Sequence, residues 1–92
     1  MSKINREIAE QLVAQELEKL GSPNKKFAVL EANTIETERA WIFFYDSENY
    51  IKTGIKAYRV FGNGPIVVEK ITGKITQYGS NIDLDKTIKM YE

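Results

Sequence analysis

The sequence contains 92 residues, of which 42% are hydrophobic and 28% charged, so it supports one globular domain over residues 1–92 and excludes a disordered or coiled-coil chain. It contains no Cys and no His, which excludes disulfide bonds, thiolate nucleophiles, imidazole bases and the usual zinc ligand sets, and we expect no metal and no cofactor. Thirteen basic residues balance thirteen acidic ones, and this net charge of zero supplies no general attraction for nucleic acid or anionic membranes.

Residues 5–20 predict an amphipathic helix. Its apolar side chains recur at helical spacing and are expected to face the core: Ile8, Ala9, Leu12, Val13, Leu17 and Leu20. Asn5 is the expected N-cap, with Ser2 as the alternative, because a side-chain oxygen at this position satisfies a free helix amide. Gly21 is expected to end the helix in a left-handed conformation, and Pro23 prevents the helix from continuing.

Glu16 is a charged residue inside this apolar stripe, between Leu12 and Leu20. Because fully buried glutamates are rare, we expect its carboxylate to reach water at the edge of the stripe. The alternative is a paired carboxylate that meets a Tyr hydroxyl, the Trp41 N–H or a Lys.

Residues 26–37 alternate in polarity and predict a strand that bends or bulges near Asn33 and Thr34. A polar turn over residues 36–39 leads into an aromatic strand, 40–45, so the two strands are expected to pair as an antiparallel hairpin. The alternation places Trp41, Phe43 and Tyr45 on one face of the second strand, and Ile42 and Phe44 on the other. With both faces apolar, this strand is predicted to lie centrally, with the first helix on one face and a loop, the C-terminal helix or a partner on the other.

Residues 47–54 predict a turn or a single helical turn, which Ser47 would cap. Residues 55–61 are predicted to form either a short strand or an irregular segment. They lead into Gly62-Asn63-Gly64-Pro65, which is expected to be a loop because glycine and proline disrupt both helices and strand ladders.

The last third of the chain predicts a hairpin and a helix. Residues 66–70 and 74–79 form the hairpin, and Gly73 supplies the positive φ of its turn. Residues 83–91 form a short helix with Asp83 as its cap. The predicted fold class is therefore α+β: an N-terminal amphipathic helix packed on a mostly antiparallel four- to five-stranded sheet, with a short C-terminal helix.

No segment matches a catalytic or nucleotide-binding motif, and we expect the protein not to be an enzyme. Gly62-Asn63-Gly64-Pro65 is not followed by the Gly-Lys-Ser/Thr of a P-loop, and Val67 stands where the dinucleotide fingerprint needs a third glycine. Asp83-Leu84-Asp85 lacks the remaining positions of a calcium loop. Ser47 has no His to activate it as a nucleophile.

The first 20 residues are charged and lack the apolar core of a signal peptide. No apolar run approaches the length needed to cross a bilayer. We therefore expect a cytoplasmic protein without a membrane partner.

Charge is distributed unevenly along the middle of the chain. Residues 31–48 carry Arg39 against five acidic residues, namely Glu31, Glu36, Glu38, Asp46 and Glu48. Residues 49–59 carry three basic residues and no acidic one, namely Lys52, Lys56 and Arg59. An acidic region beside a basic one favours steering toward a polarised protein partner, and the alternative is an ordinary mixed surface that keeps a small domain in solution.

Several segments of this chain together resemble the immunity protein 35 family, which includes YrhB-like proteins. They are Trp41-Ile42-Phe43-Phe44-Tyr45-Asp46-Ser47, Tyr50, Gly62-Asn63-Gly64-Pro65-Ile66-Val67-Val68, Thr72-Gly73, Tyr78-Gly79 and Tyr91-Glu92. The resemblance implies a small α+β protein of a bacterial polymorphic toxin system, encoded beside a toxin that often has a peptidase-type domain, which protects the producer by binding that toxin. The YrhB-like members imply an alternative, chaperone-like binding of unfolded or aggregation-prone proteins.

The expected partner is thus a cognate protein toxin, blocked sterically. Five residues are the predicted contacts: Tyr45, Ser47, Tyr50, Asn63 and Pro65. Amphipathic aromatic side chains and a loop amide at a strand end are typical of protein interfaces. By contrast, Trp41, Phe43 and Phe44 are expected in the core, and Gly62, Gly64 and Pro65 also shape the loop.

Overall fold

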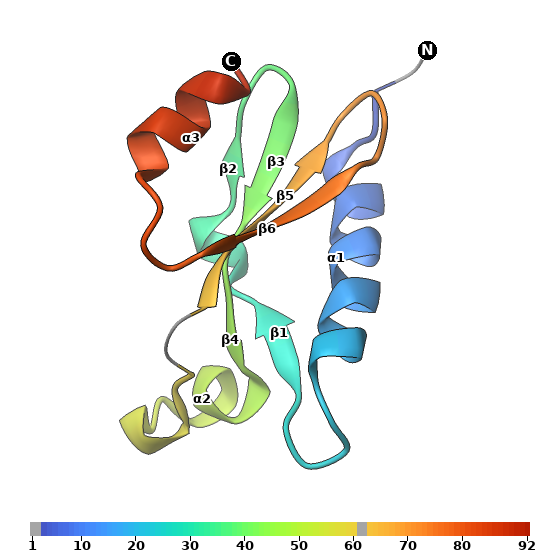
Figure 1. Cartoon of the computed structure of the whole chain (residues 1–92). Helices are drawn as coiled ribbons and strands as arrows, with labels where there is room; N and C mark the ends of the chain where they lie inside the picture. The colour runs from blue at the N-terminus through green and yellow to red at the C-terminus, as the bar shows by residue number, and fades with distance from the viewer. Residues whose placement is uncertain (1–2, 61–62) are drawn as a thin grey trace.

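The structure is a computed structural model that describes residues 3–60 and 63–92 (Figure 1). Its elements are α1 (Arg6–Leu20), β1 (Phe27–Val29), the 3-10 helix η1 (Glu31–Asn33), β2 (Ile35–Glu36), β3 (Ala40–Phe43), β4 (Tyr45–Ser47), α2 (Glu48–Thr53), the 3-10 helix η2 (Lys56–Tyr58), β5 (Asn63–Glu69), β6 (Ile75–Gly79) and α3 (Leu84–Met90). The strands form one sheet of order β1-β4 and one of order β2-β3-β5-β6, all antiparallel. The predicted α+β class is confirmed.

Helix α1 begins as predicted, because the Asn5 side chain accepts a hydrogen bond from the Ile8 amide at 2.9 Å. Its buried stripe is narrower than predicted. Ala9, Val13 and Leu17 are buried at a spacing of one helical turn, whereas Ile8 and Leu20 are exposed at the flanks of the stripe.

The prediction of a left-handed conformation at Gly21 is wrong. This residue has φ −85° and ψ −176°, an extended conformation, and the chain then turns tightly through a bridge between Ser22 and Lys25. A Cβ atom at residue 21 would lie 2.7 Å from the Lys25 carbonyl oxygen. Glycine is therefore needed here for a close backbone approach rather than for a positive φ.

Glu16 lies at the partly exposed edge of the stripe. Its carboxylate is 3.4 Å from the Lys19 ammonium and accepts a hydrogen bond from the Gln77 side chain at 3.2 Å. This side chain fits both the expectation of a solvated edge and the alternative of a Lys partner, because an ion pair at the surface can form without full burial of the carboxylate.

The single strand predicted over residues 26–37 is instead two strands, β1 and β2, separated by η1. The hairpin with β3 and β4 is confirmed, since Val29 pairs with Tyr45 and Ile35 pairs with Ile42. Between these two pairs, residues 30–34 face only residues 43 and 44. The surplus residues leave the ladder and coil into η1, which is where the predicted bend lies.

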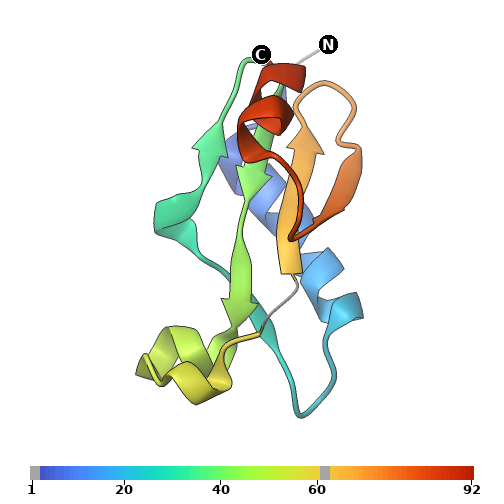
Figure 2. The ribbon, with the colours of Figure 1, turned by 60° about the vertical axis from the view of Figure 1, so that its left-hand side comes forward.

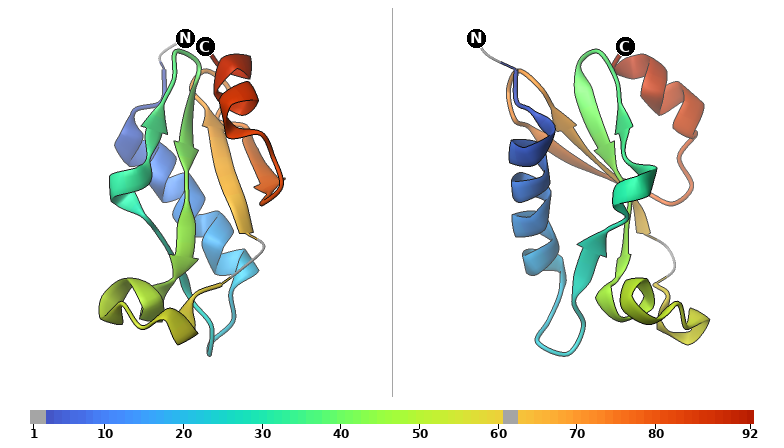
Figure 3. Two further views of the ribbon diagram at one scale, coloured as in Figure 1. Left: turned by 90° about the vertical axis from the view of Figure 1, so that its left-hand side faces the viewer. Right: turned by 180° about the vertical axis from the view of Figure 1, so that it is seen from behind.

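Strand β3 is an inner strand of its sheet, as predicted, and both of its faces are covered. Phe43, with Trp41 and Tyr45, packs against α1. Ile42, on the opposite face, belongs to a second cluster, against which Ile88 of α3 and Tyr91, the C-cap of that helix, are packed. Figure 1, Figure 2 and both views of Figure 3 show α1 and α3 on opposite sides of the sheet. The predicted alternation and the cover by the C-terminal helix are confirmed.

Asn63, Gly64 and Pro65 form the first part of β5 and not the predicted loop; Gly62 lies outside the described residues. Asn63 pairs with Gly79, and Ile66 pairs with Gln77, so Gly64 and Pro65 together face one residue of β6. This is a bulge, which accommodates a proline because the bulged residues need not donate to the ladder.

The remaining predictions for the C-terminal third hold. Gly73 has φ +72° in the turn between β5 and β6, and the Asp83 side chain caps α3 by accepting from the Lys86 amide at 3.1 Å. Ile88 packs on the second core cluster, while Leu84 is partly buried. Of the two alternatives for residues 55–61, the irregular one is confirmed by η2 over its described part.

Tyr91 fixes α3 to the sheet in a way that depends on pH. Its hydroxyl lies 2.8 Å from that of Tyr78, and burial, with this hydrogen bond, raises the pKa of Tyr91 to about 12 from 10.0. When the pKa of a group is higher in the folded than in the unfolded state, its contribution to stability is fully present below the pKa of the unfolded state. The contribution is lost as the pH rises through the pKa of the folded state. The free energy of unfolding of the wild type is therefore expected to fall between about pH 10 and pH 12, and the fall should be smaller in Tyr91→Phe. Urea titration over this pH range measures the difference.

Tyr58→Phe is the matched control, because Tyr58 is exposed and its hydroxyl makes no hydrogen bond within the described chain. Its pH profile should follow that of the wild type. If the free energy of unfolding changed with pH in the same way in the wild type and in Tyr91→Phe, the pH dependence would not come from Tyr91.

Candidate protein-binding surface

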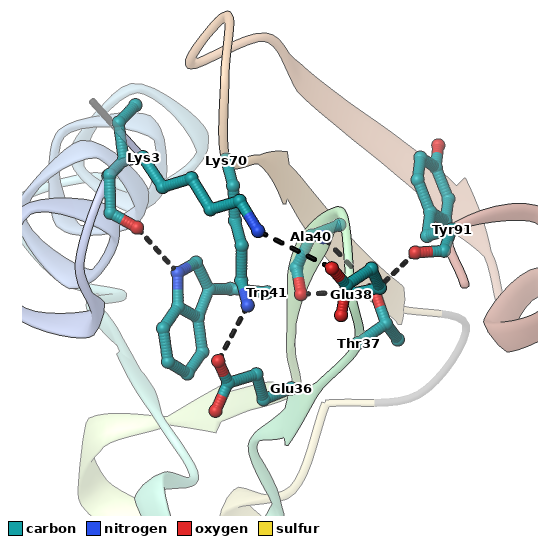
Figure 4. Close-up of polar contacts among 9 residues, drawn as sticks. Lys3, Glu36, Thr37, Glu38, Ala40, Trp41, Lys70 and Tyr91 are labelled. Carbon is teal, nitrogen blue, oxygen red and sulfur yellow. Dashed lines mark hydrogen bonds and ion pairs between the residues drawn. The ribbon is translucent and has the colours of Figure 1, made fainter. Parts of the chain in front are cut away.

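A buried lysine, Lys70, is a candidate acid–base group, since its side chain is mostly buried beside a carboxylate (Figure 4). Its ammonium lies 2.6 Å from the Glu36 carboxylate and 4.7 Å from the centre of the Trp41 ring. The Trp41 N–H donates to the Ile4 carbonyl at 3.0 Å. These contacts tie the N-terminal segment to the sheet, and they give Lys70 a structural role.

Asp46 on β4 organises the segment that follows it. Its side chain is 3% exposed. One carboxylate oxygen accepts hydrogen bonds from the Ser47 amide at 2.7 Å and the Val60 amide at 2.9 Å, and the other lies 3.3 Å from Arg59 Nε. The Arg59 guanidinium also lies over the Tyr50 ring at 5.3 Å. Both ends of the segment between residues 47 and 60 are thus fixed to one buried carboxylate.

The structure gathers four of the five sequence-predicted contact residues around β4, although several of them serve the fold. Tyr45 is half-buried, stacks edge-on against Phe27 and accepts a hydrogen bond at its carbonyl from the Asn63 side chain at 2.6 Å. Burial raises the pKa of Tyr45. The Ser47 hydroxyl is buried and caps α2 by accepting from the Tyr50 amide at 3.1 Å. The fifth residue, Pro65, is buried in the bulge of β5.

Residues 48–59 form a projection that we call the α2–η2 lobe, at the foot of the molecule in Figure 1 and Figure 2. Every residue from 51 to 59 is exposed, including Ile55 at 50% and Tyr58 at 46%. Lys52 pairs with Glu48 at 2.7 Å, and the hydrogen bond from Lys52 lowers the pKa of that carboxyl. The lobe therefore presents apolar side chains among basic ones.

Sequence reasoning identified Tyr50 and the basic charge of this segment but missed Ile51, Ile55 and Tyr58. The sequence signal was that these apolar residues lie in a short segment with no clear periodicity, but this pattern does not by itself show exposure. Without the fold, their exposure could not be separated from the burial of other apolar residues.

An open groove of about 880 Å³ lies between α1 and β1. Its floor includes Leu17, Phe27 and Val29, and five glutamates and one lysine are among the residues that line it. Within residues 3–60 and 63–92, the structure contains no group of three acidic side chains arranged to hold a metal ion. In the same ranges, none of the helices has both the length and the apolar character required to traverse a bilayer.

Comparison with protein families matches residues 7–83 of this chain to the family Immunity protein 35. A relative of this chain is YrhB of Escherichia coli strain K12, described as an uncharacterized protein, which is 30% identical over 54 residues. That match covers 59% of this chain and 57% of the relative, so it spans little more than half of each protein. No solved structure matches this chain significantly.

Proposed function

Because the chain belongs to the immunity protein 35 family, we propose that it neutralises a cognate bacterial toxin by binding it and blocking it sterically. The family assignment supports an immunity role. We further propose that the toxin is encoded by an adjacent gene and is of the peptidase type, as the resemblance implies. Binding rather than catalysis is also the chemistry that suits a chain without His and Cys.

We assign the toxin contact to the α2–η2 lobe, including Tyr50 on α2. The observation that carries this assignment is the exposure of Ile51, Ile55 and Tyr58 on a segment whose two ends are held by Asp46. Exposed apolar and aromatic side chains on a fixed support lose little conformational entropy on binding, which is the property of interface anchors. Lys52 and Lys56 at the edge would favour an acidic toxin surface and a fast association.

Of the other predicted contacts, Tyr45 and Asn63 lie next to this surface, and the buried Ser47 would act by capping α2. Pro65 is buried in the bulge of β5 and is not part of this surface. A Tyr45→Ala, Asn63→Ala variant would therefore disturb the fold as well as any interface. A cleaner test uses residues that are exposed in the free protein.

Ile55→Ser combined with Tyr58→Ser is expected to weaken toxin binding by about 2 kcal/mol, roughly thirtyfold in Kd, because it removes two exposed anchors. The measurement is the Kd of the purified pair and the survival of cells that co-express the chain with the product of the adjacent reading frame. The matched control is Ile71→Ser with Met90→Ser, which changes exposed apolar residues at 43% and 56% outside the lobe.

Wild-type affinity in a folded lobe variant, or an equal loss in the control, would contradict the assignment of the surface. Survival that does not depend on the chain would contradict the immunity role itself. The chaperone alternative predicts suppression of aggregation of an unrelated heated protein without a specific partner, and an assay of that kind separates the two functions.

A further inference from the structure

The groove between α1 and β1 has the geometry of a peptide-binding site. In Figure 1 and in the right view of Figure 3, β1 lies between α1 and β4, and α1 runs alongside it. The groove combines an apolar floor, which includes Leu17 and Phe27, with a strand edge and the flank of a helix. This combination of a helix and an edge strand is the arrangement that accepts an added strand from a partner.

One edge of β1 carries backbone groups that do not pair with β4. The Leu30 amide donates to Phe44 and the Lys26 carbonyl accepts from Glu48, so the even-numbered residues of this segment direct their backbone groups toward β4. Phe27 and Val29 then direct theirs to the opposite side. Within the described chain, neither of these amides donates a hydrogen bond. The free edge is only three residues long, but it borders the groove.

The charges around the groove indicate the charge of the segment that it would bind. The glutamates that line it are Glu7, Glu10, Glu18, Glu31 and Glu48, against Lys26. Arg6 pairs with Glu10 at 2.8 Å and Lys52 pairs with Glu48 at 2.7 Å. The carboxylates of Glu7, Glu18 and Glu31 have no ion-pair partner among the described residues.

We infer that this groove binds an extended, positively charged segment of a protein partner, which adds as a strand to the free edge of β1. Apolar side chains of the segment would cover the half-buried Phe27 and Val29, and its basic side chains would meet the three unpaired glutamates. A second copy of this chain is a poor occupant, because edge-to-edge pairing would bring two sets of the same glutamates together. This surface is separate from the α2–η2 lobe, and the inference does not depend on the identity of the toxin.

The test uses a peptide of about ten residues of alternating lysine and valine, titrated into the isotope-labelled full chain and followed by NMR. Binding is expected to slow hydrogen exchange of the Phe27 and Val29 amides by about tenfold or more, with little change at Ala28, whose amide faces β4. Two comparison peptides are used: one with glutamate in place of lysine, and one with alternate backbone amides methylated. Neither is expected to bind, because the first lacks the charge and the second lacks the ladder donors.

Protein variants test the charge independently of the backbone. Glu7→Gln with Glu18→Gln is expected to weaken peptide binding roughly three- to tenfold. Glu38→Gln with Glu92→Gln is the matched control, since these exposed glutamates do not line the groove, and it should bind the peptide as the wild type does. Equal binding of the methylated peptide, unchanged exchange of Phe27 and Val29 at saturation, or an equal effect of both double variants would overturn the inference. Because no toxin is present, failure here leaves the proposed immunity function standing.

Discussion

Asp46→Ala is expected to lower the free energy of unfolding by about 2–4 kcal/mol and to abolish toxin protection. The carboxylate is almost completely buried, and its loss leaves the amides of Ser47 and Val60 without their acceptor. Arg59 would lose its ion pair at the same time. Since these contacts hold both ends of the α2–η2 lobe, the lobe should lose its fixed position before the sheet unfolds.

Urea titration gives the change in stability, and hydrogen exchange of the Val60 amide reports the lobe directly. Asp85→Ala is the control, because Asp85 is exposed on α3 and makes no ion pair with any described residue; it should cost less than about 1 kcal/mol. A stability of Asp46→Ala within about 0.5 kcal/mol of the wild type would refute the role of this carboxylate.

Gly64→Ala is expected to destabilise the protein by about 3 kcal/mol or more, because the added methyl group has no space. A Cβ atom at residue 64 would overlap the carbonyl oxygens of Tyr78 and Gly79, which are backbone atoms and cannot rotate away. Relief requires a shift of β5 against β6 at the bulge. Thermal and urea unfolding measure the loss, and circular dichroism shows whether the variant folds at all.

Gly79→Ala, on the opposing strand of the same bulge, is the matched control. Among residues 3–60 and 63–92, a Cβ atom there would meet only the Asn81 side-chain oxygen at 3.1 Å, and that side chain can move. We expect a cost below about 1 kcal/mol. If both alanine variants were equally stable, the close backbone approach would not explain why residue 64 is a glycine.

Much of the fold could be predicted because the local pattern and the tertiary contacts agree. Asn5 and Asp83 cap their helices as expected, since a cap depends on a few consecutive residues. The alternation in residues 40–45 assigned Phe43 and Ile42 to opposite faces correctly, because successive side chains of a strand point to opposite sides. The positive φ at Gly73 followed in the same way from hairpin geometry.

The predictions that failed concern distances between segments that are remote in sequence. Gly21 and Gly64 are both required by close backbone approaches, and composition offers only loop geometry as an explanation for a glycine. Likewise, η1 exists because five residues on one strand face two on the other, a mismatch that appears only when the register is known.

Of the binding surfaces, the sequence indicated Tyr50 and a basic segment. The structure, and not the sequence, brings four of the five candidate contacts near one another. It could not show that Ser47 and Pro65 are buried, that Ile55 and Tyr58 are exposed, or that a groove lined by glutamates borders β1. Burial depends on which elements cover a residue, and a groove depends on where they fail to meet.

The sequence by itself determined the fold class, the helix N-caps, the alternation of the central strand and the family, because each rests on residue types at short spacings. Only the tertiary structure decided which polar groups are buried and which strand edge stays open. These properties arise from packing between distant segments, and the hydrogen bonds of Asp46 to both ends of the lobe are the clearest case.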